Sequence, residues 1–380
     1  MLLKFKITET FQHNDWSNTN INEMDWPRIP YDVTDGQNKF YFFRYVTIDN
    51  SSDAIESRYF PLFIRNYKFA EQAKEYADYI LKNKQEFLDH RLIPVVLDPL
   101  EGFAETTAAF ETLAEQLKPV CKVYMLSGNN LLAESKNSFE FYSTNHWIHH
   151  LKDSPSRLTK LNPNHKIYIS LNRMAREHRV MLTQTLIKNG LREFGYITWA
   201  NGRNHKHIDF SEGVSEIANA TFDILDIPDI LEKNPTMNLP LTHCDDTFLF
   251  LVTETHVCTA SLFLSEKTFK PIMLGMPFIN LGNPGTLRIL KKLGFKTFST
   301  WINEDYDLDL PIQERCDIIA SEIQRFSLMT DDDRFKIRQE MSSILIHNKK
   351  TLESQMNRSD LVESLIDIGK RIYKERKLNL

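Results

Sequence analysis

A carboxylate and an ammonium group stand side by side at Glu266 and Lys267, directly after Ser265. Serine is a preferred residue at the start of a helix, so the pattern predicts a helix that begins at Glu266. The free N–H groups and the dipole of a helix start favour phosphate, and Lys267 adds a full positive charge. A carboxylate that turns aside could accept hydrogen bonds from the two vicinal hydroxyls of a ribose. The pair therefore predicts a nucleotide-binding turn, although acidic residues also favour the first turn of an ordinary helix.

Three arginines follow the apolar segment 166–171, at Arg173, Arg176 and Arg179. Cations are disfavoured at a helix N-terminus, so an anionic ligand would explain why they gather there. The planar guanidinium group binds phosphate oxygens through two parallel hydrogen bonds. The alternative is a solvated basic turn whose charges are balanced by neighbouring carboxylates.

Two further carboxylates, Asp98 and Glu101, flank the end of the apolar segment 92–98. A carboxylate at the end of a buried strand could act as a general base that takes a proton from an acceptor hydroxyl. An ordinary role for Asp98 as a loop or cap residue is the alternative.

The elements that would position these residues alternate between apolar runs and helical periodicity, which is typical of α/β proteins. Residues 1–65 are mixed and predict short strands and loops. Residues 152–165 contain prolines and predict an interdomain linker. The later patterns predict strands over 92–98, 120–126, 166–171, 248–254 and 278–281, and helices over 66–88, 104–117, 177–189 and 286–293, with more helices to the C-terminus.

The length of 380 residues and this order of elements predict two α/β domains, at 1–155 and 156–380. In open parallel sheets, ligands bind at the carboxyl ends of the strands. Two such sheets that face each other would form a cleft between the domains, with the acceptor side in the first domain and the nucleotide side in the second.

The composition disfavours several partners. A net charge of -5 and a pI near 6.2 provide no cationic field for duplex DNA or an anionic membrane. No run reaches the roughly 18 apolar residues of a membrane span, and the N-terminus lacks the pattern of a signal peptide. The sequence therefore predicts a cytoplasmic protein with free thiols. Its four scattered cysteines are Cys121, Cys244, Cys258 and Cys316.

Several common motifs are missing. The chain contains no GxGxxG, GxxxxGK[ST] or GxSxG, which argues against a typical dehydrogenase, a P-loop NTPase or an α/β-hydrolase. The histidines show no HExxH spacing, so no metal site is predicted.

The second half of the chain resembles a known family. Glu254, a short spacer and the sequence FLSEK are similar to the donor-binding motif of the α1,3-fucosyltransferases, which reads Glu-Asn-Ser, a spacer and Asp-Tyr-Ile-Thr-Glu-Lys. The segment from Arg173 to Arg179 resembles the arginine-bearing segment of that family. The longer pattern SEKTFKPIMLGMPFINLGNPG, followed by LGFKTFSTWINEDYD, looks like glycosyltransferase-like proteins of phages and marine bacteria.

The resemblance implies a GT-B fold, in which two Rossmann-like domains face a cleft and the C-terminal one holds a nucleotide sugar. By motif position, Glu266 would hold the ribose, and Lys267 and Arg179 the diphosphate. Phe263 replaces the tyrosine of the family and Thr255 its asparagine, so the sugar is not fixed as fucose. The resemblance and the group of arginines together imply a set of donor-binding residues. These are Arg173, Arg176, Arg179, Glu254, Ser265, Glu266 and Lys267.

The resemblance also implies an inverting glycosyltransferase with Glu101 or Asp98 as its catalytic base. Its donor would be a GDP- or UDP-linked sugar and its acceptor a hydroxyl of a glycan or similar molecule. Cationic side chains and a helix dipole would stabilise the leaving diphosphate, so no metal and no cofactor beyond the donor are expected. Two alternatives stay open: a phage enzyme that glycosylates hydroxymethylated DNA bases, and a non-catalytic nucleotide-sugar-binding protein.

Overall fold

The structure is a computed structural model of the 380-residue chain. It describes residues 2–12, 39–49, 55–63, 69–89, 92–98, 102, 104–149, 151, 156–163, 165–172, 176–198, 239–257, 260–356 and 360–378. The chain divides into two units, residues 1–149 with 358–380, and residues 150–357. This division places residues 358–380 in the first unit, whereas the predicted second domain includes them. The predicted domain ranges stay a prediction.

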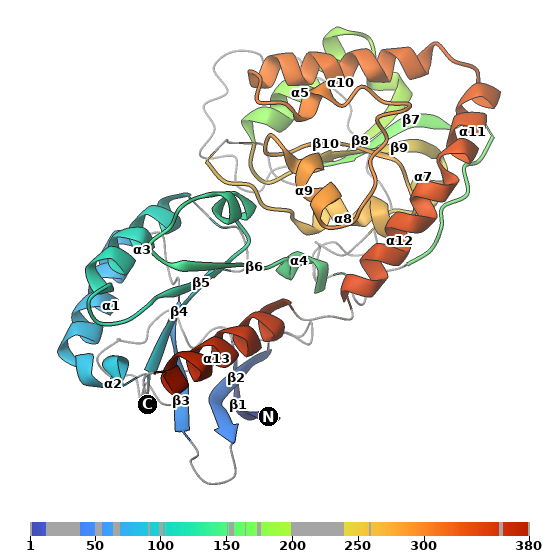
Figure 1. Ribbon diagram of the computed structural model, residues 1–380. Helices are drawn as coiled ribbons and strands as arrows, with labels where there is room; N and C mark the ends of the chain where they lie inside the picture. The colour runs from blue at the N-terminus through green and yellow to red at the C-terminus, as the bar shows by residue number, and fades with distance from the viewer. Residues whose placement is uncertain are drawn as a thin grey trace. The chain divides into compact units, whose positions relative to one another are not determined.

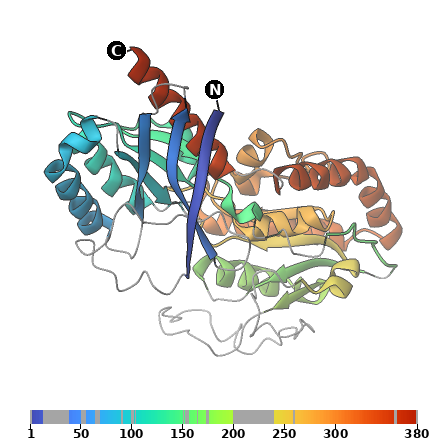
Figure 2. The ribbon, with the colours of Figure 1, turned by 90° about the horizontal axis from the view of Figure 1, so that it is seen from below.

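The first unit contains a six-stranded sheet in the order β1-β2-β3-β4-β5-β6 (Figures 1 and 2). Neighbouring strands from β1 to β3 are antiparallel, and those from β3 to β6 are parallel. The parallel part therefore brings the carboxyl ends of β4, β5 and β6 to one edge. The strands are β1 (Leu2–Gln12), β2 (Lys39–Asp49), β3 (Ile55–Phe63), β4 (Leu92–Asp98), β5 (Tyr124–Ser127) and β6 (Glu140–Ser143).

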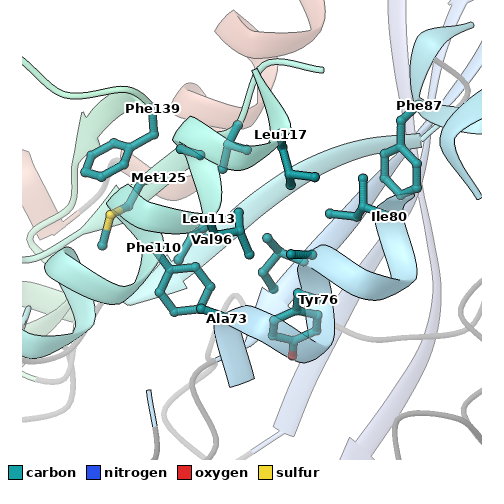
Figure 3. Packing of buried hydrophobic residues seen from close by; sticks show 14 of the residues in the cluster. Ala73, Tyr76, Ile80, Phe87, Val96, Phe110, Leu113, Leu117, Met125 and Phe139 are labelled. Atoms are coloured by element: carbon teal, nitrogen blue, oxygen red, sulfur yellow. The ribbon is translucent and has the colours of Figure 1, made fainter. Parts of the chain in front are cut away.

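Helices α1 (Phe69–Lys82) and α3 (Ala104–Leu117) pack against each other and carry the core of the first unit. Their apolar residues recur every three or four positions, so each helix buries one face. Figure 3 shows Tyr76 and Ile80 of α1 in the same cluster as Phe110 and Leu113 of α3. The remaining helical elements of this unit are α2 (Lys84–Leu88), η4 (Asn130–Glu134), α4 (His146–His149) and α13 (Asp360–Leu378), of which α13 contacts β2 and β5.

The second unit contains a parallel four-stranded sheet in the order β10-β9-β7-β8. Every residue of β9 is buried, as expected for a parallel strand that is covered on both faces. Because the strands are parallel, the residues that follow β7, β9 and β10 lie along one edge of the sheet. The strands are β7 (Lys166–Leu171), β8 (Gly195–Thr198), β9 (Thr247–Thr253) and β10 (Phe278–Leu281).

Helices surround this sheet, as Figure 1 shows. Helix α10 contacts α5 and β7, and α8 contacts β9 and α12. The helical elements are α5 (Glu177–Lys188), η5 (Arg192–Phe194), α7 (Leu241–Asp245), α8 (Glu266–Met273), α9 (Thr286–Lys292), η6 (Asp305–Asp307), α10 (Ile312–Ser327), α11 (Asp331–Glu340) and α12 (Ser342–Met356). The predicted α/β class, with parallel strands in each half, is confirmed.

Two predictions of local structure are wrong. The strand predicted at 120–126 begins only at Tyr124, because the N–H groups of Val120 and Cys121 both donate to the carbonyl of Leu117 and close the end of α3. The N-terminal region predicted as short strands contains β1 and β2, which have 11 residues each. The pairing of β1 with β2 shifts its register next to Ile7. Such irregularities interrupt the alternation of inward and outward side chains, so the full length of the strands is not apparent from the sequence.

Three of the predicted free thiols are free in the structure, at Cys121, Cys244 and Cys316, whereas Cys258 lies outside the described residues. Among the helices described, none is long and apolar enough to cross a bilayer. The location in the cytoplasm stays a prediction.

Candidate functional site

Polar side chains connect the ends of β7 and β9 in the second unit. The hydroxyl of Thr253, the last residue of β9, donates to the side-chain oxygen of Asn172, which follows β7, over 2.7 Å. The amide group of Asn172 in turn donates to the hydroxyl of Ser170 over 3.2 Å. All three residues are buried. These bonds fix the edge of the sheet from which the next residue, Glu254, projects.

The Glu254 carboxylate joins the end of β9 to the start of α8. It accepts hydrogen bonds from the N–H groups of Thr255 (3.1 Å) and Ser265 (3.3 Å) and from the hydroxyls of Ser265 and Thr268. Both of its oxygens are thus satisfied, and only 1% of the residue is exposed. Hydrogen bonds to an ionised group are among the strongest in proteins. This geometry makes Glu254 a support for the turn, and its predicted contact with a ligand stays a prediction.

Helix α8 begins at Glu266, as predicted, with Ser265 as its N-cap. The Ser265 hydroxyl accepts a hydrogen bond from the N–H of Lys267 over 3.2 Å. Pro271 lies inside this helix and removes only one bond of the helical ladder, that to the carbonyl of Lys267. Gly275, with φ 57°, follows the end of the helix as expected.

The predicted acid and base form an ion pair in the first turn of α8. Nζ of Lys267 lies 2.9 Å from Oε1 of Glu266. It also donates to the hydroxyls of Thr255 (3.2 Å) and Ser265 (3.3 Å). The other carboxylate oxygen of Glu266, Oε2, is buried and has no hydrogen-bond donor in the described part of the chain. A ligand that donates hydrogen bonds would satisfy this oxygen.

The charge on Glu266 follows from its neighbours. Burial raises the pKa of a carboxyl group, but the positive charges of Lys267 and Lys270 outweigh burial and hold the pKa of Glu266 below its ordinary value. Glu266 is therefore ionised at neutral pH and can only accept hydrogen bonds.

Two of the three predicted arginines contact the chain just after β9. Arg179 is 4% exposed, and its guanidinium donates to the carbonyls of Thr253 (3.2 Å) and Glu254 (3.0 Å). Arg176 donates to the carbonyl of Thr255 over 2.8 Å. Burial lowers the pKa of Arg179 to about 10, which leaves it charged at neutral pH. The structure thus brings Arg176 and Arg179 beside the Glu254 turn.

Two other residues of this segment, Arg173 and His178, add no observed positive charge to the turn. Arg173 lies outside the described residues. Nε2 of His178 lies 2.9 Å from the carbonyl oxygen of Glu254, and because a carbonyl only accepts, Nε2 carries the hydrogen. Burial lowers the pKa of His178 to about 3, so this imidazole is neutral and adds no charge to the site.

Sequence reasoning missed one charged residue, Lys270, which lies on α8 one turn after Glu266 and is 8% exposed. Burial lowers the pKa of Lys270 to about 8. The four-residue spacing from Glu266 is the signal that could have found it. The charged groups around the first turn of α8 and the end of β9 are then four cations (Arg176, Arg179, Lys267 and Lys270) and two carboxylates (Glu254 and Glu266), so positive charge is in excess.

The two predicted catalytic carboxylates belong to the first unit. Asp98 ends β4, is 6% exposed, and accepts a hydrogen bond at its backbone carbonyl from Gly128 over 3.0 Å. The buried side chains of Ser127 and Asn129 follow at the end of the neighbouring β5. Glu101 lies outside the described residues. Asp98 thus occupies the strand-end position expected of a binding residue in a parallel sheet.

Within the described ranges, no group of three or more His, Cys, Asp or Glu residues is arranged to hold a metal ion.

No protein-family profile matches the sequence. No curated protein matches it either.

Three solved structures are similar to this chain. The DNA-modifying enzyme β-glucosyltransferase, described in the presence and absence of its substrate uridine diphosphoglucose, is 11% identical over 82% of this chain and 98% of its own, with a TM-score of 0.33. A putative UDP-N-acetylglucosamine 2-epimerase from Listeria monocytogenes is 12% identical over 76% and 79% of the two chains, with a TM-score of 0.33. A mutant of the T4 phage enzyme BGT with UDP-glucose is 12% identical over 73% of each chain, with a TM-score of 0.31.

Proposed function

We propose that the chain is a nucleotide-sugar-dependent glycosyltransferase whose second unit binds the donor. One observation carries the proposal: Oε2 of Glu266 is buried without a donor, at a helix start that lies at the carboxyl edge of a parallel sheet. Leaving such an oxygen unsatisfied costs about 1–3 kcal/mol. A ribose diol supplies the hydrogen bonds that would recover this free energy.

The surrounding cations account for the other half of the donor. A diphosphate placed at the start of α8 would meet the positive end of the helix dipole and the charges of Lys267, Arg176 and Arg179. These charges act most strongly when the bond to the sugar breaks, because negative charge then grows on the leaving diphosphate. In this proposal the side chains take that charge without a metal or a further cofactor.

The transfer step requires a base for the acceptor hydroxyl. In the proposed inverting reaction, Glu101 or Asp98 takes the hydroxyl proton while the hydroxyl oxygen attacks the anomeric carbon from the face opposite the diphosphate. The bond from that carbon to the diphosphate breaks, and the nucleoside diphosphate leaves. The two units would form the two halves of a GT-B enzyme, with the acceptor on the first.

We propose a glycan or a similar uncharged hydroxylated molecule as the acceptor, because the net charge of the chain is -5. A DNA backbone would instead be bound through an excess of lysine and arginine. Nucleotide release in the presence of an oligosaccharide, compared with release in the presence of hydroxymethylated DNA, separates these acceptors.

The donor site is tested by a thermal-shift screen against GDP, UDP, CDP and their sugars. A ligand present at one hundred times its Kd stabilises the folded protein by about 2.7 kcal/mol. We expect a shift with one nucleotide family that disappears in Glu266→Ala and Lys267→Ala. The matched controls are the exposed residues Glu314 and Lys336 of the same unit, whose alanine variants should keep the shift.

A screen in which no nucleotide shifts the wild-type protein would remove the basis of the proposal. A shift that persists in Glu266→Ala and Lys267→Ala would place the nucleotide elsewhere.

A further inference from the structure

Lys270 is a buried cation whose ammonium group forms no hydrogen bond or ion pair with a described residue. Burying an ammonium group without such partners costs free energy, so buried lysines are almost always paired. The position of Lys270 therefore requires either a structural countercharge or a ligand.

The helix directs Lys270 toward the candidate site. Long side chains on a helix lean toward its N-terminus and over the residues three and four positions earlier, which here are Lys267 and Glu266. Burial lowers the pKa of Lys270, and the charge of Glu266 is the largest of the influences that raise it. Lys270 thus approaches the same turn as the ion pair, from the side of the second helical turn.

The other lysine of this turn has no free donor. An ammonium group has three N–H donors, and those of Lys267 face three protein oxygens, on Thr255, Ser265 and Glu266. The guanidinium groups of Arg176 and Arg179 are likewise engaged at backbone carbonyls, although each has five donors. Lys270 is the cation of this cluster with its full set of donors available.

We propose that Lys270 binds the second phosphate of the nucleotide and makes the site select nucleoside diphosphates over monophosphates. The inference rests on the proposed function. One phosphate at the helix start would meet the positive end of the helix dipole beside Lys267, and a second phosphate would reach the ammonium group of Lys270, whose side chain leans toward that turn. The excess of positive charge in the cluster matches a ligand with more than one negative charge.

The test is calorimetric titration with UDP and UMP, or with the corresponding pair for the base that the screen selects. We expect the wild type to prefer the diphosphate. Lys270→Met should weaken diphosphate binding by about 10- to 100-fold, the size of a hydrogen bond to a charged group, and should change monophosphate binding by less than about twofold. Lys270→Arg should keep part of the preference, and Lys336→Met on the exposed face of α11 should keep all of it.

The outcomes distinguish a failure of the proposed function from a failure of the role proposed for Lys270. If the wild type binds neither nucleotide, the proposed function fails. If it prefers the diphosphate and Lys270→Met keeps that preference, the role of Lys270 is overturned while the donor site stands. An equal loss for both ligands in Lys270→Met would show a structural countercharge and would also overturn the inference.

A second measurement covers the case in which Lys270→Met does not fold. In the wild-type protein, the ratio of the two affinities should fall as the pH rises from 7 to about 9 and Lys270 loses its proton, while Arg179 stays charged. The groups that act on Lys270 are Glu266, Lys267, Glu254 and Cys244, and the pKa of the Cys244 thiol is raised by burial to about 12. The base and sugar are common to both ligands and cancel in the ratio. A ratio that is constant over this range would contradict the proposal.

Discussion

At the residue scale, two buried carboxylates of the same turn have different surroundings. Glu254 has donors for both oxygens, whereas Oε2 of Glu266 has none among the residues described. The hydrogen bonds to Glu254 stabilise the folded protein, and Oε2 of Glu266 can still accept a hydrogen bond from a ligand. A stability measurement and a binding measurement should therefore respond to different residues.

The first prediction contrasts the two glutamates. Glu254→Gln replaces an acceptor oxygen by an NH2 group that faces donors, so we expect it to lower the free energy of unfolding by roughly 1.5–3 kcal/mol in urea titrations. Glu266→Gln should change stability far less and should weaken nucleoside diphosphate binding by about tenfold or more. Equal effects of the two changes on both measurements would contradict this division of roles.

The second prediction concerns Asp307, the last residue of η6, whose side chain contacts the start of α9. Its Oδ2 accepts the N–H of Leu287 over 2.9 Å, and its Oδ1 has no partner in the described part of the chain. Burial raises the pKa of Asp307 to about 7, whereas an unfolded aspartate has a pKa of about 4. Between these values only the folded protein holds the proton, so the free energy of unfolding falls as the pH rises.

Urea titrations at several pH values between 4 and 7.5 check this linkage. Asp307→Asn cannot ionise and should lose the part of the slope between about pH 4 and 7 that belongs to this group. A slope that is unchanged in Asp307→Asn would show that other groups cause it.

At the scale of elements, continuous apolar runs and helix signals predicted much of the fold. The predicted bounds of β4, α3, β7 and β10 agree with the structure because each is a buried run or an amphipathic pattern with clear breaks. The strand β8 was not predicted, because it begins with a glycine and only alternate residues of it are buried, so it lacks the continuous apolar run of β10. The association of α13 with β2 and β5 depends on contacts between distant parts of the chain, which no local pattern reveals.

The candidate site was predictable to a similar extent. The helix start at Glu266 follows from a local rule about Ser265, and the structure confirms it. The hydrogen bonds that Glu254 accepts from Ser265 and Thr268 join a strand end to a helix, so no local pattern shows that both oxygens of Glu254 are satisfied. The burial of Lys270 likewise depends on tertiary packing.

The third prediction compares two helix N-caps. Thr330 caps α11 by accepting the N–H of Asp333 over 3.1 Å, and Ser265 caps α8. Thr330→Ala should lower the free energy of unfolding by about 1 kcal/mol and leave nucleotide affinity unchanged. Ser265→Ala should lower it further, because Glu254 also loses a donor, and should weaken nucleotide binding. Urea titrations and calorimetry measure the two effects, and equal results for both variants would contradict the account.

At the scale of the whole molecule, the proposal assigns binding and proton transfer to different units. The donor residues belong to the unit of residues 150–357, and Asp98 belongs to the unit that contains residues 1–149. A base that acts only in the transfer step contributes to turnover and not to donor affinity. Substitutions of the donor residues should therefore change donor affinity, whereas substitutions of the base should change turnover alone.

The fourth prediction is that Asp98→Asn or Glu101→Gln lowers kcat by about 10²- to 10⁴-fold while the Kd for the nucleoside diphosphate stays within about twofold. The variant with the larger loss identifies the base. Glu266→Ala provides the opposite case, since it should raise the Kd. The rate of nucleotide release with the active acceptor and a calorimetric titration measure the two quantities. Full activity in both carboxylate variants would exclude these residues as the base.

The most direct measurement is a crystal structure of the protein with the nucleoside diphosphate that the thermal-shift screen selects. The account predicts that both ribose hydroxyls donate to the Glu266 carboxylate and that the phosphates lie at the first turn of α8, within reach of Lys267 and Lys270. A nucleotide bound elsewhere, or one whose ribose leaves Glu266 without a hydrogen bond, would contradict the assignment of this turn as the donor site.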